Sequence, residues 1–195
     1  MAELQFTEFM GENVIRSLKF CGKNVVLYAT CKIQRPQFAE LDDFSRVMDF
    51  SFIDAGESFK LGKYSIITWH VVIEGMAKTF IGDRCFIGPG SKLLTSTYEL
   101  NGWYSSELLP AGAHKTRYGD IVIKDDAYIG ANCTIMPGVM IGEGAVVGAN
   151  ALVNKDLEPW GIYVGTPCKK IGEREEPSNN CKDIISKLNW DNHLF

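Results

Sequence analysis

A period of six residues governs the second half of the chain. Aliphatic side chains occupy positions 123, 129, 135, 141, 147 and 153 at constant spacing, and Gly or Asn recurs between them. A helix would repeat its apolar face at three and four residues and a flat strand at two, so neither fits. Short strands joined by tight turns do fit, because Gly and Asn accept the left-handed conformation that such corners need. The pattern predicts a parallel β-helix built from hexapeptide repeats.

The same period is visible, with interruptions, from Phe20 onward. Residues 32–40 break it and carry a proline, and it returns with anchors at Leu41, Leu61 and Ile81, which are twenty residues apart. Three hexads make eighteen residues, so each of these coils has two extra residues, and insertions in a solenoid tend to stack on one side. We therefore expect one all-β domain over 1–195, with a lead-in over 1–19, a β-helix over 20–158 and a C-terminal cap over 159–195.

Residues 94–122 leave the repeat. They contain Gly, Pro, three tyrosines, Trp103 and His114, and no six-residue pattern fits them. A loop of this length in a compact domain is usually functional or disordered, and its aromatic side chains argue against disorder. We predict a long excursion from the β-helix that has a functional role.

Both ends of a β-helix need a cover, because a bare end exposes unpaired backbone groups. Apolar residues at rough helical spacing within 1–19 predict a short amphipathic helix there, which is either a cap or a plain lead-in; they are Phe6, Phe9, Met10, Val14 and Leu18. At the other end, the segment DIISKLNW (183–190) predicts a weak amphipathic helix that closes the solenoid.

Composition places the chain among soluble globular proteins. Apolar residues make up 46% of the chain and charged residues 23%, and the formal net charge is −4. No apolar run is long enough for a transmembrane helix, the acidic N-terminus is unlike a signal peptide, and the negative charge argues against nucleic-acid binding. Six cysteines without a C-x-x-C pair are typical of reduced thiols in a cytoplasmic protein.

Several motifs carry a family resemblance. IGANCT (129–134), IGEGAV (141–146) and VGANAL (147–152), followed by NKD (154–156) and GIYVGTPCKKIG (161–172), resemble the left-handed β-helix acyltransferases. The resemblance covers residues 41–172 and is closest to the sugar acetyltransferases, which end in V-x-K-D and G-x-P-A-K-x-I. It implies a left-handed coil, a homotrimer with active sites between subunits, acetyl-CoA as co-substrate and no metal. In that family, a long excursion at this place covers the active site of the neighbouring subunit.

The resemblance also implies which residues hold coenzyme A. Small residues that suit a narrow groove for pantetheine occur on the last coils at Ala131, Gly148 and Ala149. Lys155, with Asn154 beside it, matches the family lysine near the nucleotide end. Lys169 and Lys170 follow in PCKKIG, and Lys170 is a candidate for the 3′-phosphate as a point charge.

Acyl transfer needs a base for the proton of the attacking group, and the chain has histidines at 70, 114 and 193. His70 stands three residues after the anchor Ile67, at a coil corner where galactoside-type enzymes hold an active-site Asn or Asp. His114 lies in the excursion, and His193 is two residues from the end of the chain. We take His70 and His114 as candidate bases and leave open which of them, if either, acts.

The usual base of the galactoside and maltose acetyltransferases is a His in T-x-x-H, and its position here is occupied by Tyr98. A sugar hydroxyl needs a well-placed base at neutral pH, whereas a sugar amine with a pKa of about 8 is already partly neutral. Enzymes that acylate amino groups on nucleotide-linked deoxysugars share the EPWGIY-G-x-P ending found at 158–167 and do not all keep that His. The absence of this His favours N-acylation, although His70 or His114 can substitute and leave O-acylation open.

Aromatic residues that can stack on a sugar or a base are Tyr98, Trp69 and Trp103, our candidates for substrate contact. The three histidines are too scattered for a zinc site. The sequence predicts a cytoplasmic acetyl-CoA-dependent acyltransferase that acts on a nucleotide-linked amino sugar for surface polysaccharide (O-antigen or capsule). The alternatives are a sugar O-acetyltransferase of the galactoside or maltose type and a β-helix scaffold without activity.

Overall fold

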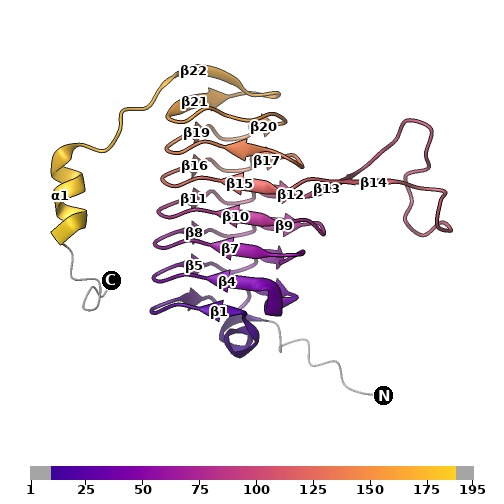
Figure 1. Ribbon diagram of the computed structural model, residues 1–195, viewed down its shortest axis with the longest axis horizontal. Helices are drawn as coiled ribbons and strands as arrows, with labels where there is room; N and C mark the ends of the chain where they lie inside the picture. Colours follow the sequence, from indigo (N-terminus) through magenta and orange to yellow (C-terminus); the bar gives the residue numbers. More distant parts are fainter. Residues whose placement is uncertain (1–9, 188–195) are drawn as a thin grey trace.

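The computed structural model describes residues 10–187 and shows a parallel β-helix (Figure 1). Each coil contributes one short strand to each of three sheets, as the six-residue period predicts. The first sheet contains β1 (Phe20–Cys21), β4 (Ala39–Leu41), β7 (Phe59–Leu61), β10 (Thr79–Ile81), β15 (Ile121–Ile123) and β18 (Met140–Ile141). The second contains β2 (Val26–Leu27), β5 (Arg46–Val47), β8 (Ile66–Ile67), β11 (Phe86–Ile87), β16 (Tyr128–Ile129), β19 (Val146–Val147), β21 (Gly161–Val164) and β22 (Lys169–Glu173). The third contains β3 (Lys32–Gln34), β6 (Phe52–Asp54), β9 (Val72–Glu74), β12 (Lys92–Leu94), β17 (Thr134–Ile135) and β20 (Leu152–Val153).

The register of the strands follows the repeat spacing in the sequence. Lys60 pairs with Glu40 and with Phe80, each twenty residues away, whereas Val122 pairs with Met140 eighteen residues on. The side chains of the hexad anchors point into the solenoid and are buried in one continuous core. Each fully buried Ile or Val stabilises the fold by about 1.5–3 kcal/mol. The anchors are therefore what holds successive coils together.

The two extra residues of the longer coils lie at the corner between the third and the first sheet, which we call the insertion corner. In the first coil this corner is occupied by a 3₁₀ turn, η2 (Pro36–Phe38). The strands on either side, Lys32–Gln34 and Ala39–Leu41, pair in register with the next coil. The prediction that residues 32–40 interrupt the repeat was wrong, because Pro36 lies at a corner where the ladder needs no N–H from it.

The excursion leaves from the same insertion corner, between β12 and β15, and projects away from the solenoid (Figure 1). It begins and ends as a hairpin in which β13 (Ser96–Tyr98) pairs antiparallel with β14 (Thr116–Tyr118). Its limits are slightly narrower than 94–122, since Leu94 still belongs to β12 and β15 begins at Ile121.

The N-terminal end of the solenoid is covered by the 3₁₀ helix η1 (Gly11–Ser17), whose Val14 is fully buried. Residues 1–9, which include Phe6 and Phe9 of the expected amphipathic helix, lie outside the described residues.

At the other end, the coil continues past residue 158. β21 adds to β19 in parallel, and β22 folds back antiparallel on β21, so this hairpin covers the end. The helix α1 (Asn179–Lys187) has no buried residue and lies beside the solenoid (Figure 1). The predicted C-terminal helix is present, but the expectation that it closes the end was wrong, because the β21–β22 hairpin already pairs the backbone there.

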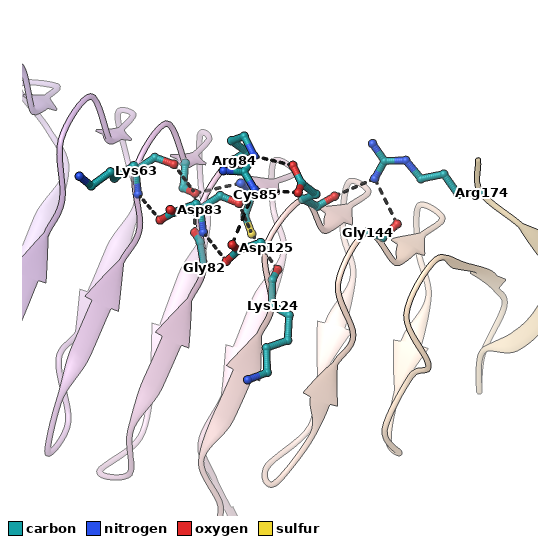
Figure 2. Close-up of polar contacts among 11 residues, drawn as sticks. Lys63, Gly82, Asp83, Arg84, Cys85, Lys124, Asp125, Gly144 and Arg174 are labelled. Carbon is teal, nitrogen blue, oxygen red and sulfur yellow. Dashed lines mark hydrogen bonds and ion pairs between the residues drawn. The ribbon is translucent and has the colours of Figure 1, made fainter. Parts of the chain in front are cut away.

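The corner between the first and the second sheet, which we call the polar corner, is held by aspartate side chains (Figure 2). Asp83 Oδ1 accepts the backbone N–H of Lys63 at 2.8 Å, and Asp125 Oδ1 accepts the backbone N–H of Asp83 at 3.0 Å. Each carboxylate therefore ties its own coil to the preceding one.

Charged side chains extend this network toward the C-terminus. Arg84 donates from Nε and from one terminal nitrogen to the two carboxylate oxygens of Asp126, at 2.7 and 2.8 Å, and these bonds raise the pKa of Arg84. Arg174 donates to the backbone carbonyls of Asp126 and Gly144 at 2.7 and 3.1 Å (Figure 2). The charges of the polar corner are satisfied within the fold, which gives them a structural role.

All six cysteines are free, and four of them are buried: Cys31, Cys85, Cys133 and Cys168. Burial raises the pKa of the Cys85 thiol to about 12. This cysteine is a small core residue whose thiol donates to the carbonyl of Lys124 at 3.1 Å.

Candidate active site

The corner between the second and the third sheet, which we call the His70 corner, has one residue per coil in the left-handed conformation. The residues are Phe50, His70, Gly90, Asn132 and Asn150, with φ of 60°, 58°, 73°, 57° and 61°. A left-handed conformation costs a residue with a Cβ about 1–2 kcal/mol, and Asn and Gly tolerate it best. Phe50 and His70 are thus unusual residues for this corner.

Backbone hydrogen bonds fix the stacking of successive coils at this corner. Gly90 N–H donates to the carbonyl of Trp69 at 3.0 Å, and Asn150 N–H donates to the carbonyl of Ala131 at 2.8 Å. Neighbouring coils are spaced by about 4.8 Å, as strands in any sheet are. The structure therefore brings together five residues singled out in the sequence, which form one row along the solenoid axis: Trp69, His70, Ala131, Gly148 and Ala149.

His70 is exposed and lies at one end of this row. Its imidazole stacks on the ring of Phe50, with centroids 5.1 Å apart and planes 8° apart. Trp69 beside it is 45% exposed. The next coil carries Gly90 at the equivalent position, so no side chain from that position covers the other face of the imidazole.

The small residues of the row let the backbones of successive coils approach closely. A Cβ on Gly130 would lie 2.6 Å from the nitrogen of Ala149, and a Cβ on Gly148 would lie 2.7 Å from Cγ1 of Val164. Within residues 10–187, the backbone N–H groups of Ala131 and Ala149 make no backbone hydrogen bond. These two N–H groups remain available as donors to a ligand that lies along the corner.

The candidate lysines differ in their surroundings. Lys155 and Asn154 are exposed in the turn after β20, and the charge of Lys155 partly opposes the burial that raises the pKa of the Cys168 thiol. Lys170 instead lies 2.8 Å from a carboxylate oxygen of Glu158 and 2.7 Å from one of Glu173, which raises its pKa. The charge of Lys170 is therefore already paired, whereas the exposed Lys155 is better suited to a phosphate.

The excursion residues form a second group, at the insertion corner. Tyr98 Oη donates to Glu107 at 3.1 Å, a bond that raises the pKa of Tyr98. The pair lines a cavity of about 550 Å³ with Glu74 and Tyr118. His114 is half-buried further out, and its Nδ1 has no hydrogen-bond partner among the described residues, 10–187.

Trp103 is 39% exposed in the excursion, and Lys115 Nζ lies 5.9 Å from its ring centroid. Within one chain, Tyr98, Trp103 and His114 are not brought together with His70, because the third sheet separates the two corners. The predicted catalytic and substrate residues thus fall into two groups, one on each corner, whereas Asn154 and Lys155 follow β20 and Lys170 lies on β22.

Phe50, Gly90 and Asn132, which lie on the same corner, were not predicted from the sequence. A signal was present, because each stands three residues after a hexad anchor, as His70 does after Ile67.

Among residues 10–187, no group of three or more His, Cys, Asp or Glu side chains is arranged to hold a metal ion. No helix in the same part of the chain is long and apolar enough to cross a membrane.

Comparison with known sequences agrees with the repeat architecture. The family model described as bacterial transferase hexapeptide (six repeats) matches residues 120–155. A probable macrolide acetyltransferase of Lysinibacillus sphaericus is 38% identical over 127 residues, which cover 58% of this chain and 68% of the relative. A chloramphenicol acetyltransferase of Agrobacterium fabrum is 37% identical over 129 residues, which cover 60% of this chain and 61% of the relative. The chain thus spans less than two thirds of the length of the latter.

Solved structures with the same fold include complexes of AntD, an N-acyltransferase from Bacillus cereus. One AntD variant, in complex with dTDP and coenzyme A, superposes with a TM-score of 0.83 at 25% identity, over 93% of this chain and 98% of AntD. Another, in complex with dTDP-4-amino-4,6-dideoxyglucose and coenzyme A, has a TM-score of 0.80 at 25% identity and the same coverage. A maltose O-acetyltransferase from Clostridium difficile, at 20% identity and a TM-score of 0.61, shares the fold over 85% of this chain and 74% of its own. With its repeats, its sheets and these relatives, the chain belongs to the hexapeptide-repeat acyltransferases.

Proposed function

We propose that the protein transfers an acetyl group from acetyl-CoA to the amino group of a nucleotide-linked deoxysugar. The observation that carries this proposal is the row along the His70 corner. One line along the solenoid holds an exposed imidazole, a residue without a side chain at Gly90 and, at Ala131 and Ala149, two N–H groups that make no backbone hydrogen bond within residues 10–187. The AntD complexes, which contain coenzyme A with dTDP or a dTDP-linked amino sugar, support the same combination of ligands.

In this proposal the pantetheine arm of coenzyme A lies along the His70 corner. Its amides accept hydrogen bonds from the N–H groups of Ala131 and Ala149, and its phosphates lie toward Lys155. The arm is about as long as four extended residues, roughly 14 Å. Coils stack about 4.8 Å apart, so the arm reaches across about three of them. The thioester then falls near Gly90 and His70.

His70 serves as the base. An amino group attacks the thioester as the neutral amine, and the imidazole accepts the proton that the nitrogen loses as the new amide forms. A sugar amine, with a pKa of about 8, is partly neutral at physiological pH. The proton transfer is therefore less demanding than it would be for a hydroxyl.

We further propose a homotrimer in which the excursion of one subunit completes the site of the next. Its aromatic residues Tyr98 and Trp103 lie on β13 and in the loop after it, in the segment that projects away from the solenoid (Figure 1). The outward-facing positions of the second sheet form an apolar row suited to burial against another subunit: Ile66, Phe86, Tyr128, Val146 and Ile162. The rings of Phe86 and Tyr128 stack within it at 5.0 Å.

Such a reaction belongs to the cytoplasm, where coenzyme A is used, and supplies N-acylated sugars for surface polysaccharide.

A second candidate function is acetylation of an antibiotic, favoured by the identity of 37–38% to curated relatives with the names macrolide and chloramphenicol acetyltransferase. Acetylation of a sugar hydroxyl is the third.

Thiol release from acetyl-CoA distinguishes these functions. The wild-type protein is incubated in turn with amino-sugar nucleotides, with the matching hydroxy-sugar nucleotides, with maltose, with chloramphenicol and with a macrolide. Release with amino-sugar nucleotides alone supports the proposal. Release only with an antibiotic or a hydroxyl acceptor replaces it with that function, and no release with any acceptor favours a scaffold.

A further inference from the structure

We call the space over Gly90, next to the uncovered face of the His70 imidazole, the gap at Gly90. Residues on both sides of His70 define it. Phe50 covers one face of the imidazole, and the coil on the other side contributes Gly90, which has no side chain. The backbone of Gly90 is fixed, because its N–H donates to the carbonyl of Trp69 at 3.0 Å. The gap thus lies between the exposed imidazole and the small residues of the same row.

The side-chain amide of Asn132 lies against Gly90, at the edge of this gap. A Cβ built on Gly90 would lie 2.2 Å from Asn132 Oδ1 and 3.4 Å from its Cγ, so the amide points along the corner toward Gly90. Within residues 10–187, this amide makes no hydrogen bond to another protein group. A half-turn about χ2 exchanges Oδ1 and Nδ2, which lets the amide present a donor to the gap.

Asn132 is also held in place by its own backbone. Its N–H donates to the carbonyl of Pro89 at 2.8 Å, and its φ is 57°. The amide therefore extends from a rigid corner, and a donor on a rigid element stabilises developing charge without reorganising.

We propose that Asn132 is a catalytic residue that donates a hydrogen bond to the carbonyl oxygen of the thioester in the gap at Gly90. This inference rests on the proposed function, because it takes an acyl-CoA as the occupant of the row. The acceptor nitrogen attacks the carbonyl carbon, the C=O electron pair moves to oxygen, and Asn132 Nδ2–H donates to the oxyanion. His70 takes the proton from nitrogen. When the carbonyl re-forms, the C–S bond breaks and His70 gives its proton to the leaving sulfur.

Two substitutions remove the donor and keep the corner. In Asn132→Asp the side chain keeps its shape, and Asp126 at φ 59° shows that Asp fits a left-handed corner. In Asn132→Gly the side chain is absent, as it is at Gly90. Loss of one oxyanion donor should lower kcat by about 100- to 1,000-fold while the KM for acetyl-CoA changes by less than about 3-fold. The matched control is Asn24→Gly, at φ 54° on the polar corner, which should leave kcat and KM unchanged.

Each outcome decides the inference. Loss of kcat in both Asn132 variants, with unfolding temperatures equal to that of Asn24→Gly, supports a catalytic donor. An Asn132 variant with wild-type kcat overturns the inference and leaves the proposed function standing. If kcat and the unfolding temperature of the Asn132 variants fall together, Asn132 has a structural role only. The same conclusion follows if Asn24→Gly loses kcat as well. If the wild-type protein releases no thiol with any acceptor, the proposed function fails and the inference fails with it.

Discussion

The imidazole of His70 lies flat on the ring of Phe50, with centroids 5.1 Å apart and planes 8° apart. The polar corner repeats this arrangement, since Phe44 and Tyr64 stack at 4.9 Å and 11°. That second stack is half-buried and borders a cavity lined by Ile185 of α1, whereas Phe50 and His70 are exposed. The same kind of ring stack is thus half-buried beside a cavity on one corner and exposed to solvent on the other.

Replacement of His70 by Asn tests its role as a base. Asn fits the corner, because Asn132 and Asn150 occupy it with φ of 57° and 61°. We expect kcat to fall by about 10²–10⁴-fold with little change in the KM for acetyl-CoA, as measured by thiol release. His114→Asn is the paired variant on the excursion. A large loss for His114→Asn with none for His70→Asn would refute the assignment, and small losses in both would mean that no histidine base is needed.

Replacement of Lys155 by Ala tests the nucleotide end of the cofactor site. Loss of a charged hydrogen bond is worth about 1.5–3 kcal/mol, so the KM for acetyl-CoA should rise roughly ten- to a hundredfold while that for the acceptor stays constant. Lys170→Ala is the control, since Glu158 and Glu173 already pair with Lys170. Equal effects of the two variants, or an unchanged KM in Lys155→Ala, would remove Lys155 from the site.

Glycines at the coil corners should be needed for close stacking and not for chemistry. A Cβ on Gly62 would lie 2.5 Å from backbone atoms of Gly82, whereas a Cβ on Gly172 meets only Ile162 Cδ1, at 4.0 Å. Overpacking of this kind costs about 1–3 kcal/mol, or about 2–4 °C in unfolding temperature per kcal/mol. Calorimetry should show the loss in Gly62→Ala and almost none in Gly172→Ala. If Gly62→Ala and Gly172→Ala have equal unfolding temperatures, the coils stack less tightly at Gly62 than the structure shows.

Light scattering tests the proposed trimer. The wild-type protein should have a mass of about three times 21.7 kDa. The variant Val146→Lys, on the outer face of the second sheet, should have a lower mass, because the substitution would bury an unpaired charge in the interface. Val122→Lys, on the outer face of the first sheet, is the matched control and should leave the mass unchanged. A wild-type monomer with full activity would contradict the trimer.

The sequence predicted the fold well where side-chain burial alone determines it. Anchors such as Ile129 and Val147 recur every six residues because each must fill the same narrow core, so the strands could be located without a structure. The interruption at Pro36 was misjudged, because a corner with two extra residues loses the period in sequence while it keeps the register in space. The cover of the C-terminal end was misjudged for a related reason. An antiparallel return such as β22 leaves no hexad signal, whereas the amphipathic pattern around Ile184 and Ile185 suggested a helix that packs on the end.

The candidate site was predicted only in part. His70, Trp69 and Ala149 could be selected from single positions, but their common row depends on which coil lies over which, and that follows from strand register. The importance of Gly90 and Asn132 depends on a close approach between two coils that are 42 residues apart in sequence, because the excursion lies between them. Tyr98 and His114 lie on this excursion, across the third sheet from His70 within one chain, and no local sequence pattern predicts that separation.

A crystal structure with coenzyme A bound would show directly whether the cofactor lies along the His70 corner. We expect the sulfur atom within about 4 Å of the His70 imidazole or of the gap at Gly90, because the reacting atoms must lie close together. We also expect the pantetheine amides on the N–H groups of Ala131 and Ala149. Coenzyme A that lies away from the His70 corner, for example on the polar corner or along the outer face of the first sheet, would contradict the proposed site.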